Sequence, residues 1–129
     1  MPEKHLTFVT GASRGMGAAI AQQLLQPGDT LVCISRTANA GLAEQAAAAG
    51  AHLEQWTLDL ADAAAAARRV ESWLAARSGD EFASATLVNN AAMLTRIAPL
   101  DETDAAELVR ALRVGLEAPL LLTAAFLRA

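Results

Sequence analysis

The sequence predicts an α/β fold in which helices cover a parallel sheet. Short runs of β-branched and apolar residues alternate with longer segments that are rich in alanine and leucine. These longer segments have about ten residues or more, the length of a crossover between parallel strands. No linker, repeat or low-complexity boundary divides the 129 residues, so we expect a single domain.

The first half of the chain contains two clear strands and two helices. Residues 6–10 (LTFVT) and 30–35 (TLVCIS) are apolar and β-branched, as buried strands are. Residues 18–26 place Ile20 and Leu24 one helical turn apart and stop at Pro27-Gly28. Residues 38–49 form an alanine-rich segment that ends at Gly50, a residue typical of helix ends.

The second half continues the alternation. Residues 51–58 predict a third strand and residues 61–77 a helix. A fourth strand covers 86–88, with a start as early as Ser84, and a loop follows over 90–101. A last helix begins near Thr103 and carries Leu108, Leu112, Leu116 and Leu120 at four-residue spacing, the pattern of an amphipathic helix.

Composition excludes several classes of protein. The net charge of −4 argues against a nucleic-acid partner. The longest apolar tract, 116–127, is too short to cross a membrane and contains Glu117 and Pro119. A lone cysteine, Cys33, and the absence of a secretory signal lead us to expect a cytoplasmic protein. Neither histidine, His5 or His52, has metal-ligand spacing, so we expect no metal site.

Three glycines lie between the first strand and the first helix, in a segment (GASRGMG) that we expect to be irregular. Gly11 can make the tight turn, Gly15 can let the backbone approach a pyrophosphate, and Gly17 allows close packing of helix and strand. The following helix offers free N–H groups to phosphate. The alternative is a glycine-rich connector without a ligand. No Gly-Lys-Ser/Thr sequence completes a Walker phosphate loop.

This loop, with the sequence Thr10-Gly11-Ala12-Ser13-Arg14-Gly15-Met16-Gly17, resembles the TGxxxGxG motif of the short-chain dehydrogenase/reductase family. The resemblance continues at Asp59-Leu60 and at Asn89-Asn90-Ala91-Ala92, where the family usually has NNAG, and it covers the whole chain. It implies a Rossmann-type doubly wound parallel sheet with strand order 3-2-1-4. Within the family, the segment around Gly115 is most similar to sepiapterin- and benzil-reductase-like members.

The resemblance also implies a dinucleotide site. The expected cofactor-binding residues are Gly11, Ser13, Arg14, Gly15, Met16, Gly17, Ser35, Arg36, Thr37, Asp59, Leu60, Asn89, Asn90 and Ala91. No acidic residue ends the second strand, where an NAD site usually has one. Arg36 stands there instead, between hydroxyl side chains, and Arg14 is a second cation, so we predict NADP(H). The alternative is that both arginines are solvated surface charges.

Two of these residues have specific implied roles. Asp59 resembles the family's adenine-contacting aspartate, although an N-cap of the helix from Ala61 is an alternative or additional role. Asn89 resembles the asparagine that stabilises the central sheet beside the cofactor, with an ordinary turn residue as the alternative.

The family's catalytic tyrosine and lysine have no counterpart in this chain, which contains no tyrosine and only Lys4. Gly115 stands where the family often has an asparagine that supports a proton relay. Pro119 has no N–H, so the Gly115 carbonyl four residues back loses its helical partner. We therefore hypothesise that Gly115 keeps a backbone role, holding a relay water at a kink.

These observations predict that residues 1–129 are the NADP-binding half of a reductase whose catalytic half is absent from this chain. Completed by that half, it would reduce a small carbonyl substrate. A non-catalytic dinucleotide-binding module and an inactive fragment are the alternatives. The fourth strand would be an open edge, and the last helix would expose Leu120, Leu121, Phe126 and Leu127. Because this helix commonly forms a dimer face in the family, we expect a homo-oligomer of the complete protein.

Overall fold

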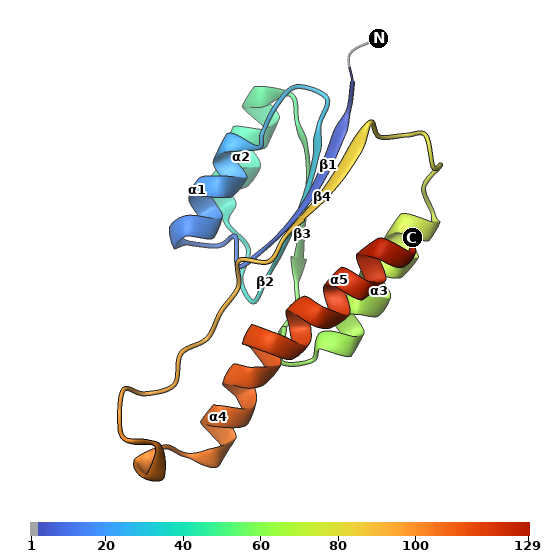
Figure 1. Cartoon of the computed structure of the whole chain (residues 1–129). Helices are drawn as coiled ribbons and strands as arrows, with labels where there is room; N and C mark the ends of the chain where they lie inside the picture. The colour runs from blue at the N-terminus through green and yellow to red at the C-terminus, as the bar shows by residue number, and fades with distance from the viewer. Residues whose placement is uncertain (1–2) are drawn as a thin grey trace.

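The computed structural model describes residues 3–129. Strands and helices alternate up to β4, as expected (Figure 1). In chain order the elements are β1 (His5–Thr10), α1 (Gly15–Gln23), β2 (Thr30–Ser35), α2 (Ala40–Ala49), β3 (His52–Thr57), α3 (Ala63–Ala75), β4 (Ser84–Val88), a 3₁₀ turn (Leu100–Glu102), α4 (Ala105–Leu112), a π-helical turn (Arg113–Glu117) and α5 (Ala118–Arg128).

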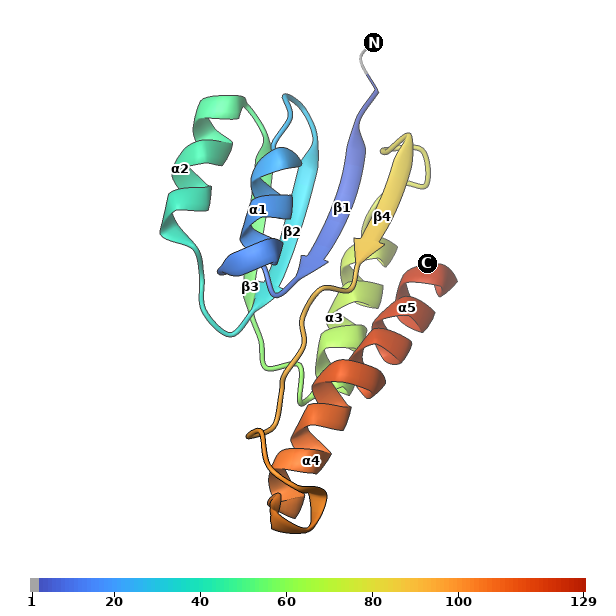
Figure 2. The same cartoon turned by 60° about the vertical axis from the view of Figure 1, so that its left-hand side comes forward.

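The four strands form one parallel sheet in the order β3-β2-β1-β4, which confirms the predicted Rossmann-type topology. In this register Thr10 of β1 pairs with Ile34 of β2, and Val9 pairs with Val88 of β4. The carboxyl ends of the strands therefore meet at one edge of the sheet, the lower edge in Figure 2. The glycine turn that follows β1 and the loop that follows β4 both leave from this edge.

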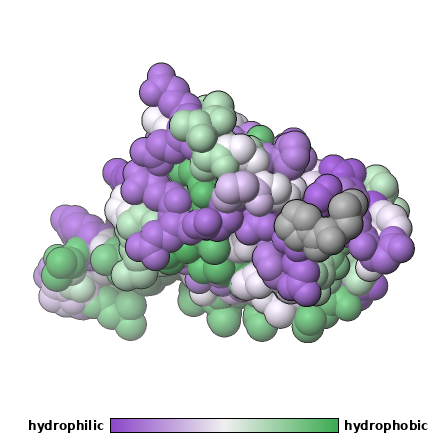
Figure 3. All heavy atoms as spheres, turned by 90° about the horizontal axis from the view of Figure 1, so that it is seen from above, coloured by the Kyte–Doolittle hydropathy of each residue, from purple (hydrophilic) through white to green (hydrophobic). Residues whose placement is uncertain are grey.

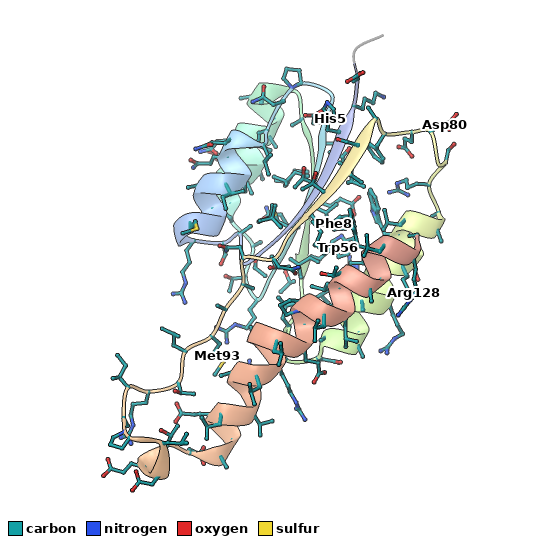
Figure 4. The ribbon with its side chains drawn as sticks, in the orientation of Figure 1. His5, Phe8, Trp56, Asp80, Met93 and Arg128 are labelled. Atoms are coloured by element: carbon teal, nitrogen blue, oxygen red, sulfur yellow. The ribbon has the colours of Figure 1, made fainter. Side chains whose placement is uncertain are left out.

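Helices cover both faces of the sheet because the strands are apolar on both sides. Leu31 and Cys33 of β2 are buried on the side of α1 and α2, whereas Val32 and Ile34 are buried on the side of α3 and α5. Phe8 of β1 anchors the second layer. Its ring meets the ring of Trp56 edge-on, with centroids 5.7 Å apart (Figure 4). The rings of Trp73 and Phe126 also meet it edge-on, with centroids 5.5 and 6.2 Å away.

The first helix begins earlier than the sequence predicts. Gly15 and Gly17, expected in an irregular loop, lie in the first turn of α1, and the helix ends at Gln23 rather than at Gln26. The Leu24 N–H bonds to the carbonyls of both Ile20 and Ala21, at 3.2 and 3.1 Å. The last turn is thus tightened before the chain reaches the proline.

Side-chain caps set the starts of α2 and α3. The Asn39 side chain accepts from the Leu42 N–H at 3.2 Å, so α2 begins at Ala40 and not at residue 38. Asp62 accepts from the Ala65 N–H at 3.4 Å and is the N-cap of α3. The interpretation of Asp59 as the cap of a helix from Ala61 is therefore wrong, although Asp59 does accept from the Ala61 N–H at 3.0 Å.

The last helical segment is not continuous α-helix. A π-helical turn separates α4 from α5, and the Ala118 N–H donates to the Arg113 carbonyl five residues back. The residues that face the core are Val114, Ala118, Leu122 and Ala125. Leu112, Leu116 and Leu120 are 56–63% exposed, so their four-residue spacing marks a surface stripe.

The prediction for the end of this helix is correct only in part. Leu120 and Leu127 are exposed, as expected. Leu121 and Phe126 are instead partly buried against the core between α3 and α5. The β4 strand is an edge of the sheet among the described residues, also as expected.

Candidate functional site

The turn after β1 depends on glycine at two positions. Gly11 has a φ of +70°, in the left-handed region, and its N–H donates to the Ile34 carbonyl at 2.8 Å. A Cβ atom on Gly17 would lie 2.0 Å from the Gly11 carbonyl oxygen. The first turn of α1 therefore packs directly on the preceding backbone, which only a residue without a side chain allows.

Asn90 fastens this turn to the end of β4. Its side-chain amide donates to the carbonyls of Thr10 and Gly11, both at 3.2 Å. The Thr10 hydroxyl accepts from the Asn90 and Ala91 N–H groups, at 3.0 and 2.9 Å. These bonds hold the carboxyl ends of β1 and β4 together.

The N-terminus of α1 has no side-chain cap. Arg14 occupies the N-cap position in an extended conformation, and its side chain makes no capping hydrogen bond. Gly15 has a φ of +61°, and no protein atom lies within 4 Å of the place a Cβ would take. The first N–H groups of the helix, with their partial positive charge, are thus available to an anion.

A cavity of about 370 Å³ opens beside this turn. Of the predicted site residues it is lined by Gly11, Arg14, Ser35, Arg36, Asp59, Leu60 and Ala91. It also extends to Met93, which lies on the long loop between β4 and α4 in Figure 4. Residues from the ends of all four strands therefore converge on one hollow.

Positive charge dominates this cavity. Arg14, Arg36 and Arg110 line it, and Asp59 is the one acidic residue among its described lining residues. The Ala61 N–H bonded to the Asp59 carboxylate, and next the Arg110 guanidinium, hold the pKa of Asp59 below its usual value of 3.8. Asp59 is therefore an anionic acceptor at neutral pH, in a site otherwise suited to phosphate.

Other predicted residues lie outside the lining of this cavity. Gly15 and Met16 are exposed at the start of α1, where Met16 is 73% accessible, whereas Gly17 is buried. Ser13 and Thr37 are in the neighbouring loops. The remaining two predicted residues that do not line it are Asn89 and Asn90, whose side chains bond elsewhere in the protein.

The interpretation of Asn89 as the sheet-stabilising asparagine is wrong. Its amide donates to the Thr123 hydroxyl on α5 at 3.2 Å, and Asn90 makes the bonds to the β1 turn. With two asparagines in sequence, alternation along the strand decides which one faces the turn. The sequence alone offered no way to fix that register.

Gly115 lies in the π-helical turn and is exposed. Pro119 supplies no N–H to its carbonyl, and a Cβ on Gly115 would meet no atom within 4 Å. The helix is π-helical at this position, and the role of the Gly115 carbonyl in holding a water stays a prediction.

Sequence reasoning missed several lining residues. These are Ile34, Leu58, Arg110 and Val114, together with Ala92, Met93 and Leu94 of the loop expected over 90–101. Ile34, Leu58 and Ala92 lie at or near strand ends already identified, whereas Val114 lies in the π-helical turn. Arg110 carried no signal beyond its charge, because its helix is far from the glycine loop in sequence.

A larger hollow, of about 650 Å³, lies at the opposite end of the sheet between α3, β4 and α5. None of the predicted site residues lines it. Within residues 3–129, no group of histidine, cysteine and acidic side chains is placed to hold a metal ion. No described helix is long and apolar enough to cross a membrane.

Comparison with known sequences agrees with this geometry. The family profile for short chain dehydrogenase matches residues 5–129. A benzil reductase ((S)-benzoin forming) of Bacillus subtilis (strain 168) is 34% identical over 122 residues, which cover 95% of this chain and 47% of that protein. An L-xylo-3-hexulose reductase of Hypocrea jecorina (strain QM6a) is 33% identical and is matched over 46% of its length.

Solved structures give the same result. A short-chain oxidoreductase from a metagenome, in complex with NADP, superposes with a TM-score of 0.83 at 35% identity, over 96% of this chain and 55% of that one. A short-chain dehydrogenase/reductase from Burkholderia vietnamiensis superposes with a TM-score of 0.80 at 36% identity, over 96% and 56%. The chain thus spans about half the length of the relatives it matches.

Proposed function

Because this chain belongs to the short-chain dehydrogenase family of NAD(P)-binding oxidoreductases, we propose that it binds NADP(H) across the carboxyl edge of its sheet. The pyrophosphate lies against the Gly11 turn and the uncapped start of α1. The adenosine half occupies the cavity of about 370 Å³. When bound, the reduced cofactor supplies a hydride for a carbonyl carbon.

The observation that carries the preference for NADP(H) is the charge at the end of β2. Ser35 and Arg36 line the cavity together with Arg14 from the glycine turn. A carboxylate at this place would accept from a ribose 2′-hydroxyl and repel a 2′-phosphate. Two guanidinium groups instead attract a phosphate and can donate to it in pairs. The NADP complex of a structural relative supports the same choice.

Asp59 and Leu60 are proposed to bind the adenine. The Asp59 carboxylate is anionic and exposed at the cavity, so it can accept a hydrogen bond from the adenine amino group. Leu60, which is buried, adds apolar surface at the same place. Ala91 lines the cavity directly after Asn90, which we propose acts on the cofactor only by holding the glycine turn in place.

The test of the cofactor preference is the Arg36→Ala variant. We expect it to weaken NADPH binding about tenfold or more, because a charge-assisted bond to phosphate contributes roughly 1.5–3 kcal/mol. NADH binding should change less than threefold. Arg68→Ala, which removes an exposed arginine of α3 outside the cavity, is the matched control. Binding is measured by titration of the reduced-nicotinamide fluorescence, and equal weakening of NADPH and NADH would contradict the proposal.

For the complete protein we propose reduction of a small carbonyl compound. The names of the matched relatives, a benzil reductase and a hexulose reductase, support this substrate class. Hydride must reach the carbonyl carbon and a proton its oxygen, and this chain contains no tyrosine to donate that proton. Gly115 is proposed to hold a relay water through its carbonyl, because Pro119, four residues on, has no N–H to donate to it.

A second candidate function is a dinucleotide-binding module without turnover. The absence of tyrosine from the chain favours it. The two functions are distinguished by assaying the protein with NADPH and an aromatic diketone. Oxidation of NADPH in step with loss of the carbonyl supports the reductase. NADPH binding without oxidation supports the module. For either function we propose a cytoplasmic location, because a lone thiol such as Cys33 stays reduced in the cytoplasm.

We also propose that the exposed stripe on α4, the π-helical turn and α5 packs against a second copy of the chain. Val109, Leu112, Leu116 and Leu120 form it, and they line a shallow groove. Figure 3 shows hydrophobic residues along the lower margin of the molecule. Contiguous apolar surface of this kind marks interfaces. Leu116→Glu should convert a dimer into a monomer in sedimentation measurements, and an unchanged mass would refute this assignment.

A further inference from the structure

An ion pair spans the adenosine end of the cavity. The Nη2 atom of Arg110, on α4, donates to Oδ2 of Asp59 at 2.7 Å, across 51 residues of sequence. Both side chains line the same cavity. The pair therefore connects α4 to the segment between β3 and α3, at the place where Asp59 would contact the adenine.

The contacts of Asp59 leave its carboxylate held but still able to accept. Oδ1 accepts a hydrogen bond from the Ala61 N–H at 3.0 Å, and Oδ2 accepts one from the Arg110 guanidinium. A carboxylate offers about four acceptor positions, so both oxygens retain capacity for a ligand donor. The side chain is 46% exposed, so a ligand can reach it. Held from two sides, the carboxylate has little rotational freedom left to lose on binding.

The pairing also divides the positive charge of the cavity. Arg110 is neutralised by Asp59 at 2.7 Å, whereas Arg14 and Arg36 have no such short acidic partner among the described residues. Phosphate is therefore drawn to Arg14 and Arg36. The end with Asp59 is left with an acceptor that suits an amino group.

We propose that Arg110 is a positioning residue for the cofactor: it fixes the Asp59 carboxylate so that this carboxylate selects adenine by its 6-amino group. The proposal rests on the proposed function of NADP(H) binding. It assigns to α4 a part in nucleotide recognition that neither the glycine motif nor the acidic residue shows by itself. Removing Arg110 should therefore damage base selection more than phosphate binding.

The test compares NADPH with its hypoxanthine analogue, in which a carbonyl oxygen replaces the amino group. We expect the unaltered protein to bind NADPH about tenfold more tightly than the analogue, because the analogue sets an oxygen against the carboxylate and forfeits a charge-assisted bond. In Arg110→Met the ratio of the two dissociation constants should fall to about two or three, and Arg110→Lys, which keeps a cationic donor, should restore most of it. Arg113→Met, on the same helical segment but outside this cavity, is the control and should leave the ratio unchanged.

A second measurement needs no ligand. The carboxyl carbon of Asp59, followed by NMR against pH, reports its pKa. Arg110→Met should raise this pKa toward the ordinary value, and Arg113→Met should not change it, because only the first removes a donor to the carboxylate. The pair is exposed, so both variants should remain folded.

The outcomes separate this inference from the proposal beneath it. No NADPH binding by the unaltered protein would refute the proposed function, and the inference with it. NADPH binding with the same base preference in Arg110→Met as in the unaltered protein would refute the inference alone. Equal loss of preference in Arg110→Met and Arg113→Met would also refute it, since that result would show a general effect of charge on this segment.

Discussion

Gly17→Ala is the substitution for which the structure gives the sharpest expectation. The new Cβ would lie 2.0 Å from the Gly11 carbonyl oxygen and 2.5 Å from the Asn90 amide nitrogen. Carbon and oxygen normally approach no closer than about 3.3 Å. The start of α1 would therefore have to move by more than an ångström, away from backbone that cannot yield as a flexible side chain can.

The expected cost follows from the contacts that this movement disturbs. Overpacking of a close contact costs about 1–3 kcal/mol. The two bonds from the Asn90 amide to the Thr10 and Gly11 carbonyls contribute about 1 kcal/mol each. The higher helix propensity of alanine offsets this cost by up to about 1 kcal/mol. We therefore expect the free energy of unfolding to fall by about 2–4 kcal/mol, with a loss of NADPH binding of at least about tenfold.

Urea unfolding followed by circular dichroism measures the first quantity, and fluorescence titration with NADPH measures the second. Gly41→Ala is the matched control. It lies near the start of α2, where a Cβ would meet only the Asn39 side chain at 3.6 Å. The control should be as stable as the unaltered protein or slightly more stable. If Gly17→Ala unfolds at the same urea concentration as Gly41→Ala, the steric argument for this turn fails.

Two further expectations concern ionisable groups. Because the folded pKa of Asp59 is lowered, its contribution to stability is present above its unfolded value of 3.8 and is lost as the pH falls through the folded value. At pH 7 the free energy of unfolding of Asp59→Asn should thus be lower than that of the unaltered protein, by less than about 1 kcal/mol because the ion pair is exposed. This difference, measured by urea unfolding, should disappear in acid. Burial raises the pKa of the Cys33 thiol to about 12. Ellman's reagent at pH 8 should therefore modify Cys33 only after unfolding, and rapid reaction of the folded protein would contradict its placement behind α1 and α2.

Much of the fold was predictable because it depends on local pattern. β1 and β2 are short apolar runs, and the turns that lead from α1, α2 and α3 to the next strand each contain a glycine. The end of α2 at Gly50 was predicted in this way, and Gly50 adopts the left-handed conformation there. The first turn of α1 was not, because an isolated Gly-Met-Gly segment has little helix propensity. In the folded chain, Gly17 packs on the Gly11 carbonyl in the first turn of α1. This contact is tertiary, so the local sequence does not show it.

The structure of the last helical segment was also not predictable from local pattern. Leucines at four-residue spacing looked like one apolar face, but most of them form the exposed stripe. The π-helical turn inserts extra rotation between α4 and α5, and the smaller residues Val114, Ala118 and Ala125 pack against α3 instead. A spacing argument assumes one regular helix, and Pro119 breaks that assumption.

Local sequence is enough to place the glycine turn between strand and helix and the arginine at the end of the second strand, since both are set within a few residues of chain. The folded chain is needed to show that Asn90, and not Asn89, ties β4 to the β1 turn, and that Arg110 reaches Asp59. Those contacts join segments 51 to 80 residues apart. Their existence depends on strand order and on the register of a parallel sheet, in which a shift of one residue turns a side chain to the opposite face.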